Sequence, residues 1–567
     1  MHDVVIRGGT IVDGTGAPAR TGDVAIDGGR VTSVGAKAGA ARREIDAEGL
    51  LVTPGWVDIH THYDGQVTWD PHLTPSGWHG VTTLVMGNCG VGFAPAKPDR
   101  HEWLIGLMEG VEDIPGTALA AGIDWQWESF PEYLDAIERM PRALDVGAQV
   151  PHGAVRAYVM GERGAKNQKP TADDIEAMAA IVREALRAGA LGFSTSRTLL
   201  HRAVDGEPVP GTFAGEDELL GIGRALGDVG TGVLELASDL APEGKELAWM
   251  ERLSVETGRP VSFALLQSDF DPTQWRRLLD ATDTAAARGA RLVPQVAGRP
   301  TGLLLGLESS FHPFAFHPTY RELAALPLAE RVRKLRDPAI RAKVLGEKPE
   351  GVLPIVAFIA GSFHKLFPLG DPPDYEPAPE RSVKAMAERA GLRPEEVAYD
   401  LLLERDGREL LYFPLLNYAN FDFEPIREML LHPRTVLGLS DGGAHCGIIC
   451  DASLPTFMLT HWTRDRKRGE KLPLEAVVAG QTRKTAELYG LDDRGVLAPG
   501  MLADVNVIDY DALRLSPPRM VFDLPASGRR LVQHAEGYVA TLKCGEPIFE
   551  NGEPTGALPG KLVRGRV

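Results

Sequence analysis

Cysteine is scarce in this chain. Its 567 residues include four, scattered at Cys89, Cys446, Cys450 and Cys544. Four separated cysteines are too few for a disulfide framework, and this predicts a reducing compartment. The spacing of Cys446 and Cys450 matches neither a zinc ribbon nor a redox motif, so we interpret these two as packing residues.

Long apolar runs are also missing. No run reaches the length of a membrane-spanning helix, and the opening MHDVVIRGGTIVDG has neither the basic start nor the apolar stretch of a signal peptide. We therefore expect a cytoplasmic protein with no membrane partner.

The chain has no excess of positive charge. Its 60 basic and 78 acidic residues give a formal charge of -18, which argues against nucleic acid as a partner. The hydrophobic content of 44% is ordinary for a globular protein, and no internal repeat or low-complexity segment is found. These features favour a globular protein that acts on a small molecule.

Both ends of the chain are rich in β structure. Residues 3–54 alternate short β-rich runs with glycine turns, and the last seventy residues repeat that texture. We predict one small β-sandwich that is assembled from both termini, residues 1–55 and 496–567.

The middle of the chain, residues 56–495, predicts an α/β fold. Most of its apolar runs are followed by a helical pattern, such as the helix capped by Thr171 and closed near Gly189. We count eight such runs: VTPGWVDIH, VTTLVMGNC, DVGAQVPH, ALGFSTS, TGVLELAS, PVSFALLQ, RLVPQVAG and TVLGLSDGG. Eight parallel strands indicate a (β/α)8 TIM-like barrel, whose active site lies at the carboxyl ends of the strands.

A long excursion, residues 298–434, separates the seventh run from the eighth and contains helical patterns of its own. An insertion of this length is often a lid or a substrate wall. An oligomer contact is the alternative, and it stays open.

Two histidines end the first strand, in GWVDIHTHYDG. Alternate residues of a strand share a face, so His60 and His62 are expected to point into the barrel together. Cys89 ends the second strand in MGNCG, where a thiolate opposite two imidazoles would suit Zn²⁺. A single histidine would more often be structural, and a buried cysteine more often a small apolar residue.

The eighth strand ends in GLSDGG and places Asp441 at the rim of the barrel. An aspartate before two glycines could simply begin a turn. Beside a metal it could instead be a weak ligand and a general base that takes a proton from water. We therefore predict a metal site of His60, His62, Cys89 and Asp441, with Asp441 as the catalytic residue.

Six further polar residues could line the pocket. They are predicted as substrate-binding residues: His152, Arg197, His201, Gln267, Arg299 and His445. Arg299 follows the seventh strand, where a guanidinium could clamp a substrate carboxylate through two bonds. His152 could contact a developing oxyanion or merely cap a loop, and Glu235 is a further candidate on the fifth strand.

The chain resembles the amidohydrolase superfamily, and within it the D-aminoacylase, or N-acyl-D-amino-acid deacylase, branch. The resemblance spans almost the whole chain and rests on GWVDIHTHYD, MGNCGVGFAP, VEDIPG, WESFPEYLDAI, GALGFSTS, GLSDGG and RGVLAPGMLADVNVID. It implies a metal-dependent barrel with a small β-sandwich that hydrolyses the amide of an N-acyl-D-amino acid. By the same resemblance His60, His62, Cys89 and Asp441 match metal ligands, and Asp441 matches the base.

The chain departs from the branch on two strands. The branch usually has a histidine at the end of the fifth strand and another at the end of the sixth, followed by a lysine that helps to hold the substrate carboxylate. Here these segments read VLELASDL and VSFALLQSD, without histidine or lysine. One divalent metal, with zinc as the first choice, is therefore expected instead of two.

These observations predict a metal-dependent hydrolase of an amide or cyclic amide. Two alternatives stay open: the same site could act on a lactone or catalyse a decarboxylation, or the chain could be a binding protein without catalysis. A homo-oligomer is expected for this architecture.

Overall fold

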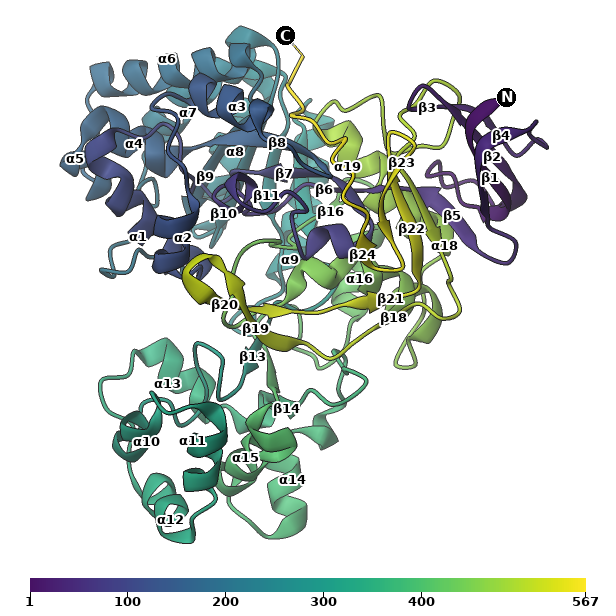
Figure 1. Cartoon of the computed structure of the whole chain (residues 1–567). Helices are drawn as coiled ribbons and strands as arrows, with labels where there is room; N and C mark the ends of the chain where they lie inside the picture. The colour runs from purple at the N-terminus through teal and green to yellow at the C-terminus, as the bar shows by residue number, and fades with distance from the viewer. Residues whose placement is uncertain (567) are drawn as a thin grey trace.

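The computed structural model describes residues 1–566, and a parallel sheet of eight strands lies at its centre (Figure 1). In order of pairing, these strands are β6 (Trp56–Asp58), β7 (Val81–Met86), β8 (Asp145–Pro151), β9 (Gly192–Arg197), β10 (Val233–Ser238), β11 (Val261–Ala264), β12 (Leu292–Val296) and β16 (Val436–Leu437). Each of the eight predicted runs coincides with one of them to within one residue or contains it, which confirms the predicted TIM-like barrel. The first run also contains the end of β5 (Leu51–Pro54), which pairs outside the barrel.

The two end strands of this sheet, β6 and β16, meet only beyond their carboxyl ends. An isolated parallel bridge joins Thr61 to Gly442. The amide of His62 donates to the Gly442 carbonyl at 2.7 Å, and the amide of Asp441 donates to the His60 carbonyl at 3.1 Å. The barrel is therefore closed by the two segments that carry His60, His62 and Asp441, three of the four predicted metal ligands.

Helices connect the barrel strands and cover their outer face (Figure 1). They are α1 (His101–Glu112), α2 (Gly116–Gly122), α3 (Phe130–Arg139), α4 (His152–Met160), α5 (Glu162–Ala165), α6 (Ala172–Ala188), α7 (Glu216–Val229), α8 (Glu243–Thr257) and α9 (Gln274–Ala287). Helix α6 begins with a capping box, in which the Thr171 side chain accepts from the amide of Asp174, and it ends at Gly189 with φ 108°. These are the boundaries that the sequence predicts for this helix.

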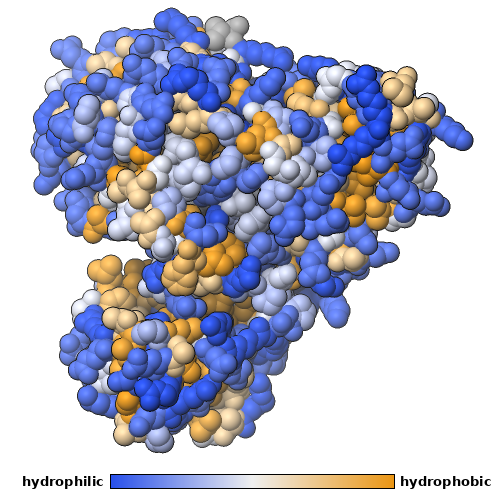
Figure 2. Space-filling model, in the orientation of Figure 1, coloured by the Kyte–Doolittle hydropathy of each residue, from blue (hydrophilic) through white to orange (hydrophobic). Residues whose placement is uncertain are grey.

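Most of the excursion, residues 302–414, forms a separate lobe below the barrel in Figure 1. Its elements are β13 (Gly302–Leu305), α10 (Pro318–Leu323), α11 (Leu328–Leu335), α12 (Pro338–Gly346), α13 (Pro354–Gly361), β14 (Phe367–Pro368), α14 (Val383–Ala390), α15 (Pro394–Leu402) and β15 (Leu411–Pro414). The excursion ends with α16 (Glu424–Leu431), which packs against the barrel beside β12. The lobe has its own apolar core, which includes Leu305, Val344 and Phe413. Figure 2 shows a notch between this lobe and the rest of the molecule, bordered by apolar residues of the lobe.

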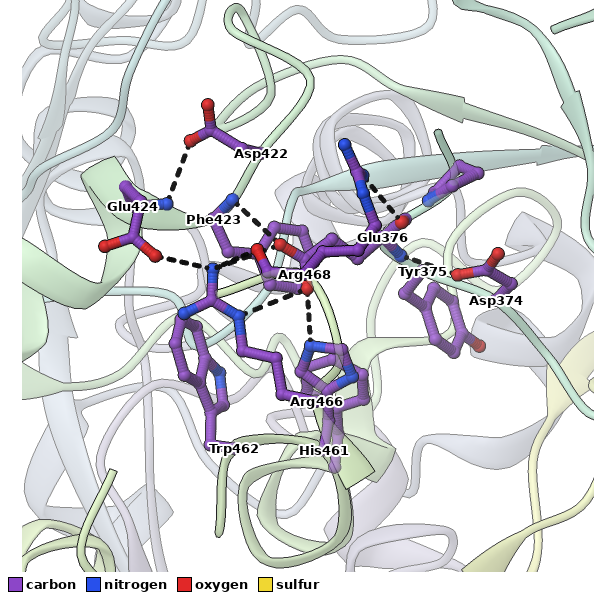
Figure 3. Close-up of polar contacts among 12 residues, drawn as sticks. Asp374, Tyr375, Glu376, Asp422, Phe423, Glu424, His461, Trp462, Arg466 and Arg468 are labelled. Atoms are coloured by element: carbon purple, nitrogen blue, oxygen red, sulfur yellow. Dashed lines mark hydrogen bonds and ion pairs between the residues drawn. The ribbon is translucent and has the colours of Figure 1, made fainter. Parts of the chain in front are cut away.

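A buried carboxylate fastens the lobe to the segment after β16 (Figure 3). Glu376 accepts from His461 Nε2 at 2.9 Å and from Arg466 Nη2 at 3.1 Å, and it also accepts the amide of Phe423 at 3.1 Å. We call Glu376, His461 and Arg466 the Glu376 clasp. His461 belongs to a π-helix, Met458–Asp465, that follows α17 (Leu454–Phe457) and precedes α18 (Leu474–Gln481) and α19 (Arg483–Leu488).

The two ends of the chain meet in a nine-stranded sheet at the right of Figure 1. Its strands are β1 (His2–Ile11), β2 (Arg20–Asp27), β3 (Arg30–Val34), β4 (Ala41–Asp46), β5, β17 (Val505–Ile508), β22 (Tyr538–Lys543), β23 (Glu546–Glu550) and β24 (Glu553–Pro554). Strand β5 pairs with β1 on one side and with β17 on the other. Val52, Val505 and Leu542 are among the residues that form its core.

Residues 514–536 lie outside this sheet, in two short ribbons. Strand β18 (Arg514–Leu515) pairs with β21 (Ala535–Glu536), and β19 (Arg519–Leu524) pairs with β20 (Gly528–Val532). Buried Leu524 and Leu531 pack into the core of the barrel. Across residues 1–566, none of the helices combines the length and the apolar character that crossing a membrane requires.

Candidate metal centre

The four predicted ligands converge at the closure of the barrel. Potential ligand atoms of His60, His62 and Cys89 all lie within 4.8 Å of one another, and all three side chains are buried. The Cys89 Sγ is 3.3 Å from His60 Nε2. Asp441 Oδ1 lies 3.3 Å from His60 Nε2 and 3.7 Å from His62 Nε2. Groups from the ends of β6, β7 and β16 therefore face one common point.

Unusual backbone geometry brings two of these groups inward. Cys89 has φ 55° and Asp441 has φ 48°, in the left-handed region that non-glycine residues rarely adopt. Gly90 beside Cys89 also has positive φ, and a Cβ there would lie 2.7 Å from the backbone nitrogen of Ser196. Asn88 supports the turn, because its amide donates to the Thr61 and Val85 carbonyls at 3.1 and 3.0 Å. The motif GNCG is therefore required by the local shape of the chain.

Gln295 on β12 orients the His60 ring. Its Oε1 lies 3.0 Å from His60 Nδ1, and its amide nitrogen donates to Ser262 Oγ at 3.0 Å. Because an amide oxygen only accepts, Nδ1 carries the imidazole proton and Nε2 keeps a lone pair. That lone pair faces Cys89 and Asp441, as a metal ligand requires.

Buried acids surround the cluster. Glu235 Oε2 accepts from the amide of Cys89 at 2.9 Å, and its Oε1 lies 3.8 Å from His60 Nδ1. Glu112 Oε1 lies 3.3 Å from His62 Nδ1. Glu235 on β10 and Ser262 on β11 thus place oxygen groups beside Cys89 and Gln295, and neither strand carries a histidine.

The charges of the site suit a cation. Burial raises the pKa of the Cys89 thiol well above its ordinary value, and the neighbouring carboxylates of Glu235, Glu112 and Asp441 raise it further. Asp441 adds a carboxylate to the cluster, because its Oδ1 faces Nε2 of both His60 and His62. A thiolate at Cys89 therefore needs a counter-cation. Two imidazole nitrogens, a thiolate sulfur and a carboxylate oxygen form a donor set that fits Zn²⁺.

Two of the six predicted substrate-binding residues lie beside this cluster. His445 Nε2 is 3.5 Å from Glu112 Oε2. The His201 ring contacts Ser196 Oγ at 3.1 Å, and burial lowers its pKa to about 3, with further contributions from His445 and His62. Both imidazoles therefore lie near the cluster, and a role toward substrate stays a prediction for them.

The other four are engaged with protein groups. Arg299 is buried, its guanidinium donates to Asp451 Oδ1 at 2.8 Å, and it lies 4.2 Å from the centre of the Tyr375 ring. The remaining three hold these partners: His152 contacts Thr195 and Glu218, Arg197 binds Glu246 through two bonds, and Gln267 contacts Asn417 and Ala419. For these four residues a role toward substrate stays a prediction.

The residues that flank the histidines have backbone roles. Asp58 accepts the Ser440 hydroxyl at 2.6 Å and the amide of His60 at 3.2 Å. Asp64 Oδ2 accepts the amide of Gly87 at 3.2 Å. Both aspartates thereby tie the β6 segment to the segments after β16 and β7, which keeps the ligands in register.

Comparison with known proteins identifies the family. A model described as "Amidohydrolase family" matches residues 43–549. The chain belongs to the amidohydrolase family. This membership confirms the predicted class, hydrolases that act on carbon–nitrogen bonds other than peptide bonds.

Characterised relatives point to one branch of this amidohydrolase family. A D-aminoacylase of Alcaligenes xylosoxydans xylosoxydans is 28% identical, with 99% of this chain and 97% of the relative covered. An N-acyl-D-aspartate deacylase of the same organism is 27% identical, with 99% and 95% covered. The predicted resemblance to the D-aminoacylase branch is therefore confirmed.

Solved structures show the same fold. A crystal structure of D-aminoacylase superposes with a TM-score of 0.66 at 24% identity and covers all of both chains. An N-acyl-D-glutamate deacylase from Bordetella bronchiseptica, described as complexed with zinc and a phosphonate inhibitor, gives 0.65 at 23% identity over 99% of both chains.

Proposed function

We propose that this amidohydrolase hydrolyses the amide bond of an N-acyl-D-amino acid with one divalent cation, zinc as the first choice. His60, His62, Cys89 and Asp441 would hold the cation. The substrate class is supported by the names of the D-aminoacylase and N-acyl-D-aspartate deacylase relatives, which match this chain over nearly its whole length.

One observation carries the proposal of a metal site. The ligand atoms of two imidazoles and a thiol lie within 4.8 Å of one another, and a carboxylate faces them. These groups come from three strand ends that are distant in the sequence. Burial and like charge both oppose ionisation of the Cys89 thiol, so a thiolate at this position requires a cation. A shared cation gives all four groups a common purpose.

Asp441 would move the proton. A divalent cation, when bound, polarises a carbonyl and makes water a stronger acid. Asp441 Oδ1, held near both imidazoles, can accept a proton from the attacking water while the water oxygen bonds to the amide carbon. The proton goes to the nitrogen of the breaking C–N bond, which leaves as an amine.

The experiment is a substrate panel on the zinc-loaded full-length chain. We expect hydrolysis of N-acetyl-D-amino acids in preference to their L enantiomers, measured as released amine. Asp441→Asn should lower kcat by about 10²- to 10⁴-fold, the usual contribution of a general base. If lactones or β-keto acids react while every N-acyl amino acid stays inert, the amide assignment is wrong.

A further inference from the structure

The segment VEDIPG, residues 111–116, has no role in the chemistry described so far. It spans the end of helix α1, whose last residue is Glu112, and Asp113 follows as a left-handed cap with φ 50°. This abrupt end turns the two neighbouring acids to different partners. Glu112 is 1% exposed and reaches the metal centre, and Asp113 reaches the lobe.

The carboxylate of Glu112 lies between two imidazoles. Its Oε1 is 3.3 Å from His62 Nδ1, and its Oε2 is 3.5 Å from His445 Nε2. The backbone of Glu112 adds a third connection, because its carbonyl accepts from the amide of His445. Glu112 therefore faces the predicted ligand His62 through Oε1. It faces His445 through Oε2 and through its backbone carbonyl.

His62 Nδ1 and Glu112 Oε1 face each other, and neither atom has another hydrogen-bond partner within residues 1–566. Among the described residues, His62 Nδ1 and Glu112 Oε1 are both buried without a hydrogen bond at this geometry. A buried carboxylate is costly unless charge or hydrogen bonds compensate it. The shortest available compensation for Glu112 Oε1 is the N–H of His62, which a small rotation of either side chain would align.

We propose that Glu112 is a positioning residue of the metal centre, which holds the His62 ring with Nε2 toward the cation and keeps His445 beside it. This inference rests on the cation of the proposed function, although not on its substrate. With Nδ1–H directed at Glu112, the Nε2 lone pair of His62 faces Asp441, as Gln295 achieves for His60. The two ligand imidazoles are thus oriented by different groups, an amide for His60 and a carboxylate for His62.

Asp113 extends the same arrangement to the lobe. Its Oδ2 accepts the Ser310 hydroxyl at 2.8 Å and the amide of Gly447 at 3.1 Å. Gly447 lies two residues beyond His445, so the two acids together hold the segment that carries His445. Asp113 contacts none of the four predicted ligands, and it therefore offers a structural comparison for Glu112.

The test measures zinc retention by the full-length holoprotein. Glu112→Gln, Glu112→Ala, Asp113→Asn and Glu102→Gln would be loaded with zinc and challenged with a chelator. Glu102 is exposed on the same helix and serves as the matched control. Loss of a carboxylate that orients a ligand histidine typically lowers metal affinity about 10- to 100-fold. We expect a loss of this size in Glu112→Ala and a smaller one in Glu112→Gln, whose amide oxygen can still accept from His62.

The outcomes separate positioning from general stability. Asp113→Asn and Glu102→Gln should keep wild-type zinc affinity. Circular dichroism verifies that each variant is folded before its zinc affinity is measured. If Glu112→Ala does not fold, Glu112→Gln decides. Wild-type zinc affinity in Glu112→Gln and in any folded Glu112→Ala would overturn the inference, as would a wild-type protein that binds no divalent cation. Weakened zinc binding in a protein that hydrolyses no N-acyl amino acid would support the inference and refute the proposed substrate.

Discussion

At the scale of single residues, Cys89 is the predicted ligand whose protonation depends most on a cation. Its thiol is buried among carboxylates that raise its pKa, so the proton leaves only when a cation replaces it. Its inward direction depends on the left-handed backbone at φ 55° and on the glycine that follows. The site therefore combines an electrostatic demand with a fixed geometry.

Because a Cys89 thiolate requires a cation, we make a prediction for Cys89→Ser. A serine hydroxyl is a much poorer zinc ligand than a thiolate, so the variant should lose stoichiometric zinc on dialysis while the wild type keeps it. Elemental analysis of the dialysed proteins measures this. Cys544→Ser is the control, because Cys544 follows β22 in the terminal sheet. Equal zinc in Cys89→Ser and wild type would show that the thiol is not a ligand.

At the scale of elements, the attachment of the lobe depends on the Glu376 clasp. Glu376 and Arg466 are both 3% exposed, and Arg466 also packs 4.7 Å from the centre of the Trp462 ring. The clasp joins the lobe segment before α14 to the π-helix after β16 (Figure 3). Removing one member of a buried ion pair is costly, because the other charge then stays buried without its partner.

Glu376→Ala should therefore lower the stability of the chain. We expect a loss of about 3 kcal/mol in the free energy of unfolding, moderated by Glu424, which also contacts Arg466 at 3.0 Å. Urea denaturation followed by tryptophan fluorescence measures the change. Glu380→Ala, at an exposed position four residues away, should shift stability by less than about 0.5 kcal/mol. Equal stability of the two variants would show that the clasp is not important for folding.

At the scale of the whole molecule, buried neutral histidines make stability dependent on pH. His79 lies between the Thr456 hydroxyl at 2.9 Å and the Gln533 carbonyl at 2.9 Å. The carbonyl accepts from Nε2–H, so Nδ1 accepts from Thr456 and has no place for a second proton. Burial lowers the pKa of His79 to about 3. The folded chain therefore binds fewer protons than the unfolded chain between about pH 3 and pH 6.5.

The direction of the pH dependence follows from the lowered pKa of His79 in the folded chain. The stability that His79 contributes is complete above pH 6.5 and is lost as pH falls, at about 1.4 kcal/mol for each pH unit. In His79→Gln, the drop in unfolding free energy between pH 7.5 and pH 5 should be smaller by about 2 kcal/mol. Denaturant titrations at the two pH values measure it, with exposed His364→Gln as the control. An unchanged pH dependence in His79→Gln would contradict the assignment.

Local pattern predicts most of the barrel but not the length of its last strand. The apolar runs locate all eight strands because a parallel strand is buried on both faces. The eighth run spans residues 435–443, yet β16 covers only Val436–Leu437. Leu439 and Asp441 take φ 59° and 48°, which ends the extended backbone and turns Asp441 inward. Sequence pattern does not reveal such strain.

Sequence spacing predicts the parts of the site that lie close together in the chain. It does not predict the contacts between residues that only the fold brings together. The two-residue spacing of His60 and His62 predicts that both rings face the same point, as the structure shows. Glu112 stands at the end of an ordinary helix and has no local feature that separates it from a surface glutamate. Arg299 looks free at the rim, but its partner Asp451 lies 152 residues further along the chain. Interactions of this range become visible only when the fold is known.

The order of synthesis follows from the shared terminal sheet. Strand β5 ends at Pro54, while its partner β17 begins at Val505. At roughly 5 to 20 residues per second, a ribosome needs on the order of half a minute or more to make the intervening chain. During that interval one edge of β5 has no neighbour to pair with, and such an edge readily joins other chains. A nascent chain whose synthesis stops before β17 thus exposes the unpaired edge of β5. A chaperone bound near the amino terminus would cover this edge until translation ends.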